Sequence, residues 1–182
     1  LTDALECCWH CRNAKLRGVQ AEHGDYLFMH GENIDVDGFR LNGNYSFQYC
    51  RNVVIRNAEI HSKDAFWNTE DVTVYDSVVD GEYLGWHSRN LRLVNCRISG
   101  TQALCYAENL VLENCTLGED ADLCFEYSSV HAEIKGRVHS VKNPRSGRIV
   151  AEEYGDIILD EHCKAPANCS IETEKSQSGE AA

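Results

Sequence analysis

The chain has 182 residues, of which 43% are hydrophobic and 25% charged, and this composition is typical of one folded domain with a sizeable core. No apolar run approaches the ~18 residues of a membrane-spanning helix. The net charge of −12 argues against nucleic acid or an anionic membrane surface as a partner.

The chain starts at Leu1, without Met and without the pattern of a signal peptide. We interpret it as lacking its native N-terminal part. Free-looking cysteines favour a cytoplasmic location.

A short motif recurs from the N-terminus onward: a small polar residue followed by an apolar–x–apolar step. Its anchors are Asn13, Asn33, Asn52, Asp71, Asn90 and Asn109, with a degenerate copy at Ser129, and they are 19 or 20 residues apart. A second turn former follows five residues after each of the first six anchors: Gly18, Gly38, Asn57, Asp76, Asn95 and Asn114. Each unit therefore has room for short strands but not for a helix.

This period predicts an all-β fold, a single-stranded right-handed parallel β-helix of about 7–8 coils over residues 1–162. A leucine-rich repeat shares the period, but its leucine ladder is absent. The residues just before the anchors alternate in charge, as expected if they stack as ion pairs: Arg12, Glu32, Arg51, Glu70, Arg89 and Glu108. The anchors themselves predict a structural ladder of Asn side chains.

The two ends of the chain differ. After Ser129 the register loosens, and the sequence predicts a last strand over 155–160 and a polar, disordered tail over 163–182. At the N-terminus the repeat already runs at Leu5 without a polar cap. An uncapped coil exposes a strand edge, which makes a homo-oligomer through this end one possibility.

Most of the ten cysteines fit the repeat as small hydrophobes. Cys96 and Cys115 share one repeat position, and Cys11 and Cys50 share another that looks inward-facing. The C-x-x-C formed by Cys8 and Cys11 has no second pair at zinc-finger spacing, so we expect no metal. No nucleotide-binding motif is present, and we expect no cofactor. Whether Cys163 and Cys169 form a disulfide is left open.

The segment before each anchor carries unusual side chains. If this segment is an extended strand, its successive side chains point alternately to two opposite faces. This parity places the column that contains Trp9, Trp67 and Trp86 in the core. It places the columns of Tyr, His, Asp and Glu side chains on a face that is exposed to solvent. An exposed patch of Phe28, Phe47 and Phe66 lies on the same face.

Such a face resembles a carbohydrate-binding surface, since rings offer flat apolar area and carboxylates bind hydroxyl groups. The predicted ligand-binding residues are Tyr26, Tyr45, Tyr49, Tyr83 and Tyr106. The candidate catalytic residues are Asp64, Glu82, His87 and Glu126, because glycoside hydrolysis uses two carboxyl groups ~5–10 Å apart. Three alternatives stay open. The same face, with its Phe patch, is a protein or oligomer interface of a non-enzymatic scaffold; it is covered by the missing N-terminal part or by the tail; or the assumed parity is wrong.

Several strings resemble a bacterial family of unknown function that has a pectin-lyase-like right-handed β-helix. They include Lys63–Asn68, Val72–Asp76, Asp80–Trp86 and Ser140–Pro144, and the similarity spans roughly residues 4–160. The resemblance implies the fold, and implies that this chain is the C-terminal portion of longer relatives. It supplies no activity; a glycoside hydrolase or polysaccharide lyase is an analogy from the fold alone. Thr69 and His87 depart from the Cys and Asn found in many relatives.

Overall fold

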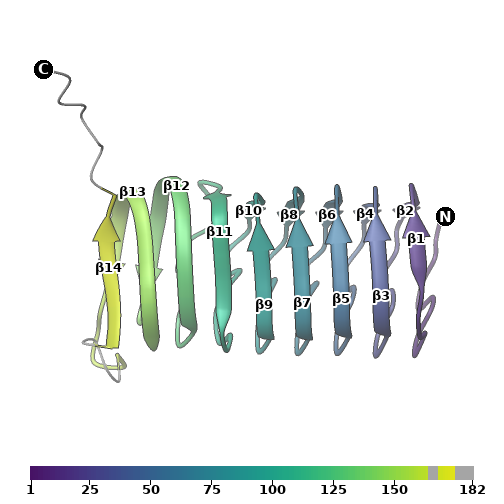
Figure 1. Ribbon diagram of the computed structural model, residues 1–182, viewed down its shortest axis with the longest axis horizontal. Coiled ribbons are helices and arrows are strands. Elements are labelled where there is room, and N and C mark those ends of the chain that lie inside the picture. The colour runs from purple at the N-terminus through teal and green to yellow at the C-terminus, as the bar shows by residue number, and fades with distance from the viewer. Residues whose placement is uncertain (164–167, 175–182) are drawn as a thin grey trace, which may run out of the picture.

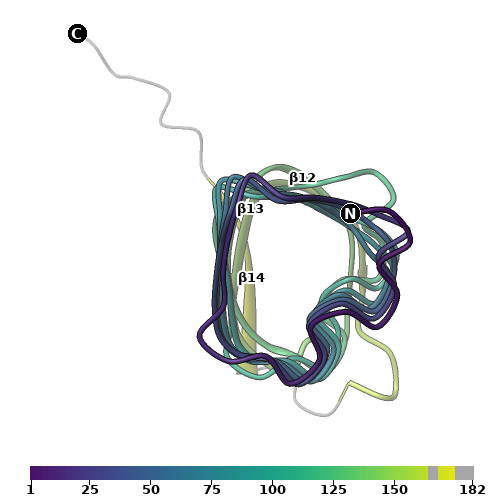
Figure 2. The same ribbon diagram turned by 90° about the vertical axis from the view of Figure 1, so that its right-hand side faces the viewer.

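The computed structural model describes residues 1–163 and 168–174. Parallel strands stack into a rod, a β-solenoid of about eight coils with essentially no helix (Figure 1). Viewed along the rod, successive coils lie over one another around a common interior (Figure 2). The predicted parallel β-helix is confirmed.

Each of the first coils contributes one strand to each of two stacks. The first stack holds β1 (Lys15–Arg17), β3 (Glu32–Asp37), β5 (Arg51–Arg56), β7 (Glu70–Tyr75), β9 (Arg89–Val94) and β11 (Leu110–Leu117). The second holds β2 (Gln20–Glu22), β4 (Arg40–Asn42), β6 (Glu59–His61), β8 (Val78–Asp80) and β10 (Arg97–Ser99). The last coils are made of β12 (Ser129–Lys142), β13 (Ser146–Ile158) and β14 (Cys169–Thr173).

The core consists of apolar columns that run along the rod. In β5, Val53 and Ile55 point inward and are fully buried, whereas the ends of the strand are exposed. Val53 pairs with Val72 on the next coil. Because parallel strands stack in register, each inward position repeats its neighbour, and β-branched side chains fit this pleated surface well.

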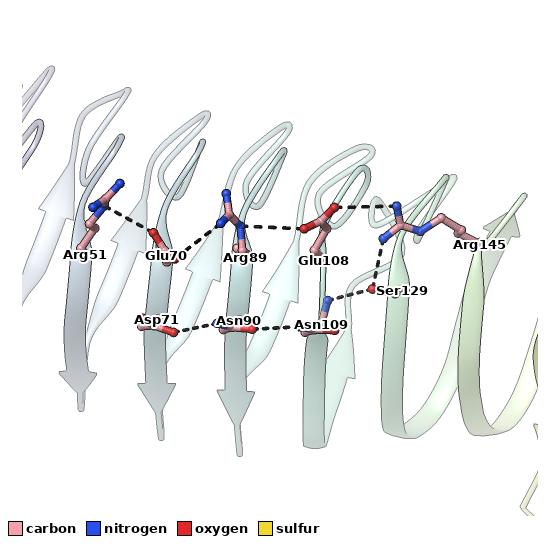
Figure 3. A network of polar contacts seen from close by, with 9 residues as sticks. All are labelled: Arg51, Glu70, Asp71, Arg89, Asn90, Glu108, Asn109, Ser129 and Arg145. Carbon is pink, nitrogen blue, oxygen red and sulfur yellow. Dashed lines mark hydrogen bonds and ion pairs between the residues drawn. The ribbon is translucent and has the colours of Figure 1, made fainter.

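The predicted ladders of polar residues are present (Figure 3). Arg51 and Glu70 form an ion pair at 3.4 Å, and Arg89 contacts both Glu70 at 3.6 Å and Glu108 at 3.8 Å. Along the anchor column the amides from Asn33 onward donate to the preceding coil, for example from Asn109 to Asn90 at 3.1 Å. The charge alternation therefore identified the register correctly.

The predicted parity of the segment before each anchor is wrong for the Phe column, although His30, Tyr49, Asn68 and His87 are exposed as predicted. Phe28, Phe47 and Phe66 are at most 3% exposed and pack in the core, whereas Trp9 is 40% exposed. The segment is a series of turns in which alternate residues have positive φ: on one coil Tyr45, Phe47 and Tyr49 lie at 61°, 54° and 59°. The alternation rule applies only to extended backbone, so it fails here.

The end of the chain also differs from the prediction. The polar tail was expected to be disordered from residue 163, but Cys169–Thr173 form β14, which pairs in parallel with β13. Residues 164–167 and 175–182 lie outside the described residues. All ten cysteines carry free thiols, including Cys163 and Cys169.

The buried phenylalanine column gives a test of the corrected geometry. Phe47 stacks on Phe28 with ring centroids 5.0 Å apart and is completely buried. Truncation to Ala leaves a cavity, so we expect Phe47→Ala to lower the free energy of unfolding by about 3–5 kcal/mol in urea titrations. Tyr49→Ala, on the same coil but 44% exposed, is the control and should cost less than about 1.5 kcal/mol. Equal costs for both variants would contradict this packing.

Candidate functional site

A groove runs along the rod beside the anchor column, and we call it the axial groove. Its first stretch has a volume of about 340 Å³ and its second about 290 Å³, and His87 lines both. One wall of the first stretch carries His30, Tyr49, Asn68 and His87. The opposite wall carries Glu32, Arg51, Glu70 and Arg89. The second stretch is lined by His87, Tyr106, Glu108, Tyr127, Asn143 and Arg145.

The turn conformation explains why these side chains form a row. His30, Tyr49 and Asn68 all have φ between 53° and 59°. Their N–H groups donate to the carbonyl groups of the next coil, as from Tyr49 to Trp67 at 2.9 Å and from Asn68 to Trp86 at 3.0 Å. From the Asn33 anchor to the Asn109 anchor, the residue two positions before the anchor is small and buried, as Gly31 and Ser88 are. The groove is thus hollow because its floor lacks large side chains.

The aromatic rings are arranged differently in the two stretches. Toward the N-terminus they stack nearly parallel: His30 and Tyr49 are 4.8 Å apart with an interplanar angle of 16°. Such rings cover one another and present mainly their edges. In the second stretch the rings are tilted, by 32° between His87 and Tyr106 and by 48° between Tyr106 and Tyr127. Tilted rings do not cover one another completely, so this stretch offers more ring surface to a ligand.

The charged wall is a chain of ion pairs. It continues into the second stretch, where Arg145 lies 3.9 Å from Glu108 and donates to the Ser129 hydroxyl at 3.4 Å (Figure 3). These groups are 30–71% exposed in the Arg51 to Arg89 part, so each pair contributes at most about 1 kcal/mol to stability. Their charges stay accessible to a ligand in the groove.

Asp64 lies outside the axial groove. It is only 3% exposed, and its buried Oδ1 has no hydrogen-bond partner among the described residues. Burial raises the pKa of this carboxyl group from 3.8 to about 6; Lys63 opposes the rise and Glu82 adds to it. Glu82 itself is exposed and forms an ion pair with Lys63 at 3.3 Å.

The structure therefore divides the predicted site residues. Tyr49, His87 and Tyr106 line the axial groove. The other predicted residues do not line it: Asp64, Glu82, Glu126, Tyr26, Tyr45 and Tyr83. Tyr26 and Tyr45 stack on each other at 4.7 Å, and the ammonium group of Lys63 lies 5.1 Å from the centre of the Tyr83 ring.

Glu126 is adjacent to the second stretch but is 7% exposed, and Lys142 pairs with it at 3.0 Å. Its carbonyl oxygen accepts the Tyr106 N–H at 2.7 Å. Burial, followed by the Glu126 charge, raises the pKa of the Tyr106 hydroxyl group, which therefore stays protonated at neutral pH. A catalytic role for the candidates Asp64, Glu82, His87 and Glu126 stays a prediction.

Most of the lining residues were not predicted as site residues, and in the second stretch these include Tyr127, Asn143 and Arg145. These three lie beyond the last clear repeat, where the register loosens. Arg145 takes the next positive place in the charge alternation, although the residue before the Ser129 anchor is the uncharged Ser128. The sequence carries no clear signal for it, because Lys135, Arg137 and Lys142 all come between Glu108 and Arg145.

Larger hollows of about 760 and 630 Å³ lie on other faces. In the larger one, Arg148 is held by the two carboxylate oxygens of Glu172 at 2.7–3.2 Å. Neither hollow gathers predicted ligand-binding residues. The axial groove is therefore the candidate site.

Within residues 1–163 and 168–174, no group of three or more His, Cys, Asp and Glu side chains could hold a metal ion. In the same part of the chain, no helix has the length and apolar character needed to cross a membrane.

Residues 1–172 of the chain match a known protein family, which is described as "Protein of unknown function (DUF3737)". The chain belongs to this family. No curated protein and no solved structure matches it. The family supplies no activity, so function has to be argued from the groove itself.

The buried carboxyl group of Asp64 predicts a pH-dependent stability. Its folded-state pKa of about 6 exceeds the ordinary 3.8, so the protonated form favours folding and stability falls as pH rises through about 6. Asp64→Asn removes this loss. We expect the variant to be more stable than the wild type by about 2–3 kcal/mol at pH 7.5, with the difference vanishing near pH 3.5.

Urea titrations across this pH range measure the effect. Glu119→Gln, at an exposed position in the sequence stretch before Asp122, is the control and should change stability little at any pH. A pH-independent difference between Asp64→Asn and the wild type would contradict the titration of Asp64.

Proposed function

We propose that the protein binds an extended carbohydrate chain along the axial groove. The observation that supports this most is the repetition of one polar and aromatic row at every coil, from His30 through Tyr49 to His87 and Tyr106. A linear ligand with a matching repeat meets equivalent groups again and again.

The spacing of the coils favours carbohydrate over peptide. Neighbouring coils stack about 4.8 Å apart, whereas an extended peptide advances about 3.3 Å per residue and repeats its side-chain direction every second residue. One hexose of an extended polysaccharide is about as long as one coil is high. Successive sugars can therefore keep register with successive coils, and peptide side chains cannot.

The groups in the groove suit sugar hydroxyls. Asn68 lines the first stretch, and its side-chain amide can both donate and accept hydrogen bonds. Tyr106 offers a hydroxyl group and part of a ring face. Aromatic rings with nearby polar groups bind a ligand that has an apolar face and a hydroxylated rim.

The proposal is binding without catalysis. A general acid must reach the glycosidic oxygen in its protonated form, but the Asp64 carboxyl group, whose pKa is raised, is buried outside the groove. The carboxylates that line the groove are ion-paired with arginines. The alternative of a protein interface depended on an exposed Phe patch, and these rings lie in the core. Association through the N-terminal coil stays a separate prediction, with Leu1 and Leu5 65% and 59% exposed there.

A glycan array followed by calorimetry on the full chain tests the proposal. We expect Tyr106→Ala to weaken binding of the selected oligosaccharide about tenfold, because it removes a ring from the groove. Tyr45→Ala is the matched control, since its ring stacks on Tyr26 outside the groove. Absence of binding across the array, or an equal loss in Tyr45→Ala, would rule the proposal out.

A further inference from the structure

We infer that the carbohydrate chain recognised by the axial groove is neutral, and that polyuronates are excluded by the alternating charges of its wall. This inference rests on the proposed function and names the class of its ligand.

The charged wall has no net charge. Three carboxylates and three guanidinium groups alternate along it: Glu32, Arg51, Glu70, Arg89, Glu108 and Arg145. Glu70, Arg89 and Glu108 each contact a neighbour on both sides, as Glu70 does with Arg51 at 3.4 Å and Arg89 at 3.6 Å. Lys142 lies close to the second stretch, but Glu126 pairs with it at 3.0 Å. No cationic surface is left over in the described groove for a chain of carboxylates.

The period of the charges also disfavours a polyuronate. Along the wall each sign of charge recurs every two coils, whereas a polyuronate carries one carboxylate on every sugar. In register with the coils, every second sugar carboxylate would face Glu70 or Glu108 instead of an arginine. Like charges at this distance repel, and the chain as a whole has a net charge of −12, which repels a polyanion at longer range as well.

A neutral sugar has no such conflict. A hydroxyl group donates to a carboxylate and accepts from a guanidinium group, so one type of ligand group satisfies both kinds of wall residue. Hydrogen bonds to charged groups are stronger than those between neutral groups. The same alternation that stabilises the stack therefore provides a donor or an acceptor for each sugar without selecting a charge.

The test compares neutral hexose oligosaccharides with oligogalacturonates of the same length, by calorimetry at low salt on the full chain. We expect the wild type to bind a neutral series and to bind oligogalacturonate at least about tenfold more weakly. Glu70→Gln leaves Arg51 and Arg89 without their shared partner. It should raise the affinity for oligogalacturonate about tenfold, and added salt should abolish the gain.

Glu59→Gln is the matched control, because it makes the same change of charge in β6, outside the groove, and should give no gain. If Glu70→Gln fails to fold, Glu108→Gln frees Arg89 and Arg145 in the same way. A wild type that prefers oligogalacturonate would overturn the inference and leave carbohydrate binding standing. Equal gains in Glu59→Gln and Glu70→Gln would also overturn it. Failure to bind either series would remove the proposed function and this inference together.

Discussion

The stacking of each coil on the next, in register, is the constraint on which the structure depends. Parallel pairing places the same repeat position of every coil in one column about 4.8 Å apart. Each position must therefore tolerate a copy of its own kind on both sides. Val53 over Val72 satisfies this in the core, and Arg51 over Glu70 satisfies it at the surface. A column of one charge sign would repel itself along the whole rod.

The same constraint explains where the polar ladders break. Each anchor amide donates to the preceding coil, from Asn33 to Asn13, from Asn52 to Asn33, and from Asn90 to Asp71. Asp71 has no amide hydrogen to donate to Asn52, so the ladder restarts there with an acceptor for the Asn90 amide. A second ladder follows the same rule, since Asn57 donates to Asp37 and Asn95 to Asp76. At this junction the coils are still joined by the Arg51–Glu70 pair.

These column rules decided what the sequence alone could predict. The Asn anchors and the charge alternation from Arg12 to Glu108 predicted the coil length and the register. They could do so because stacked positions need compatible side chains, which therefore recur at the same place in every repeat. The inward direction of Phe47 could not be predicted from the same pattern. Its backbone has a φ of 54° within a run of turns, and the parity rule assumes extended residues. The small residues were correctly placed facing inward, but the Phe column was assigned to the wrong face.

The same column rules explain which residues of the candidate site were predicted and which were missed. His87 and Tyr106 were predicted because they belong to a repeating column, and they line the groove. Arg145 was missed because the repeat ends before it, although it extends the chain of charges. The groove is a consequence of stacking: small residues form its floor and paired charges its wall. A ligand that fits it must accept the period of the coils, and a neutral hydroxylated chain does so because each hydroxyl group can bind either sign of charge.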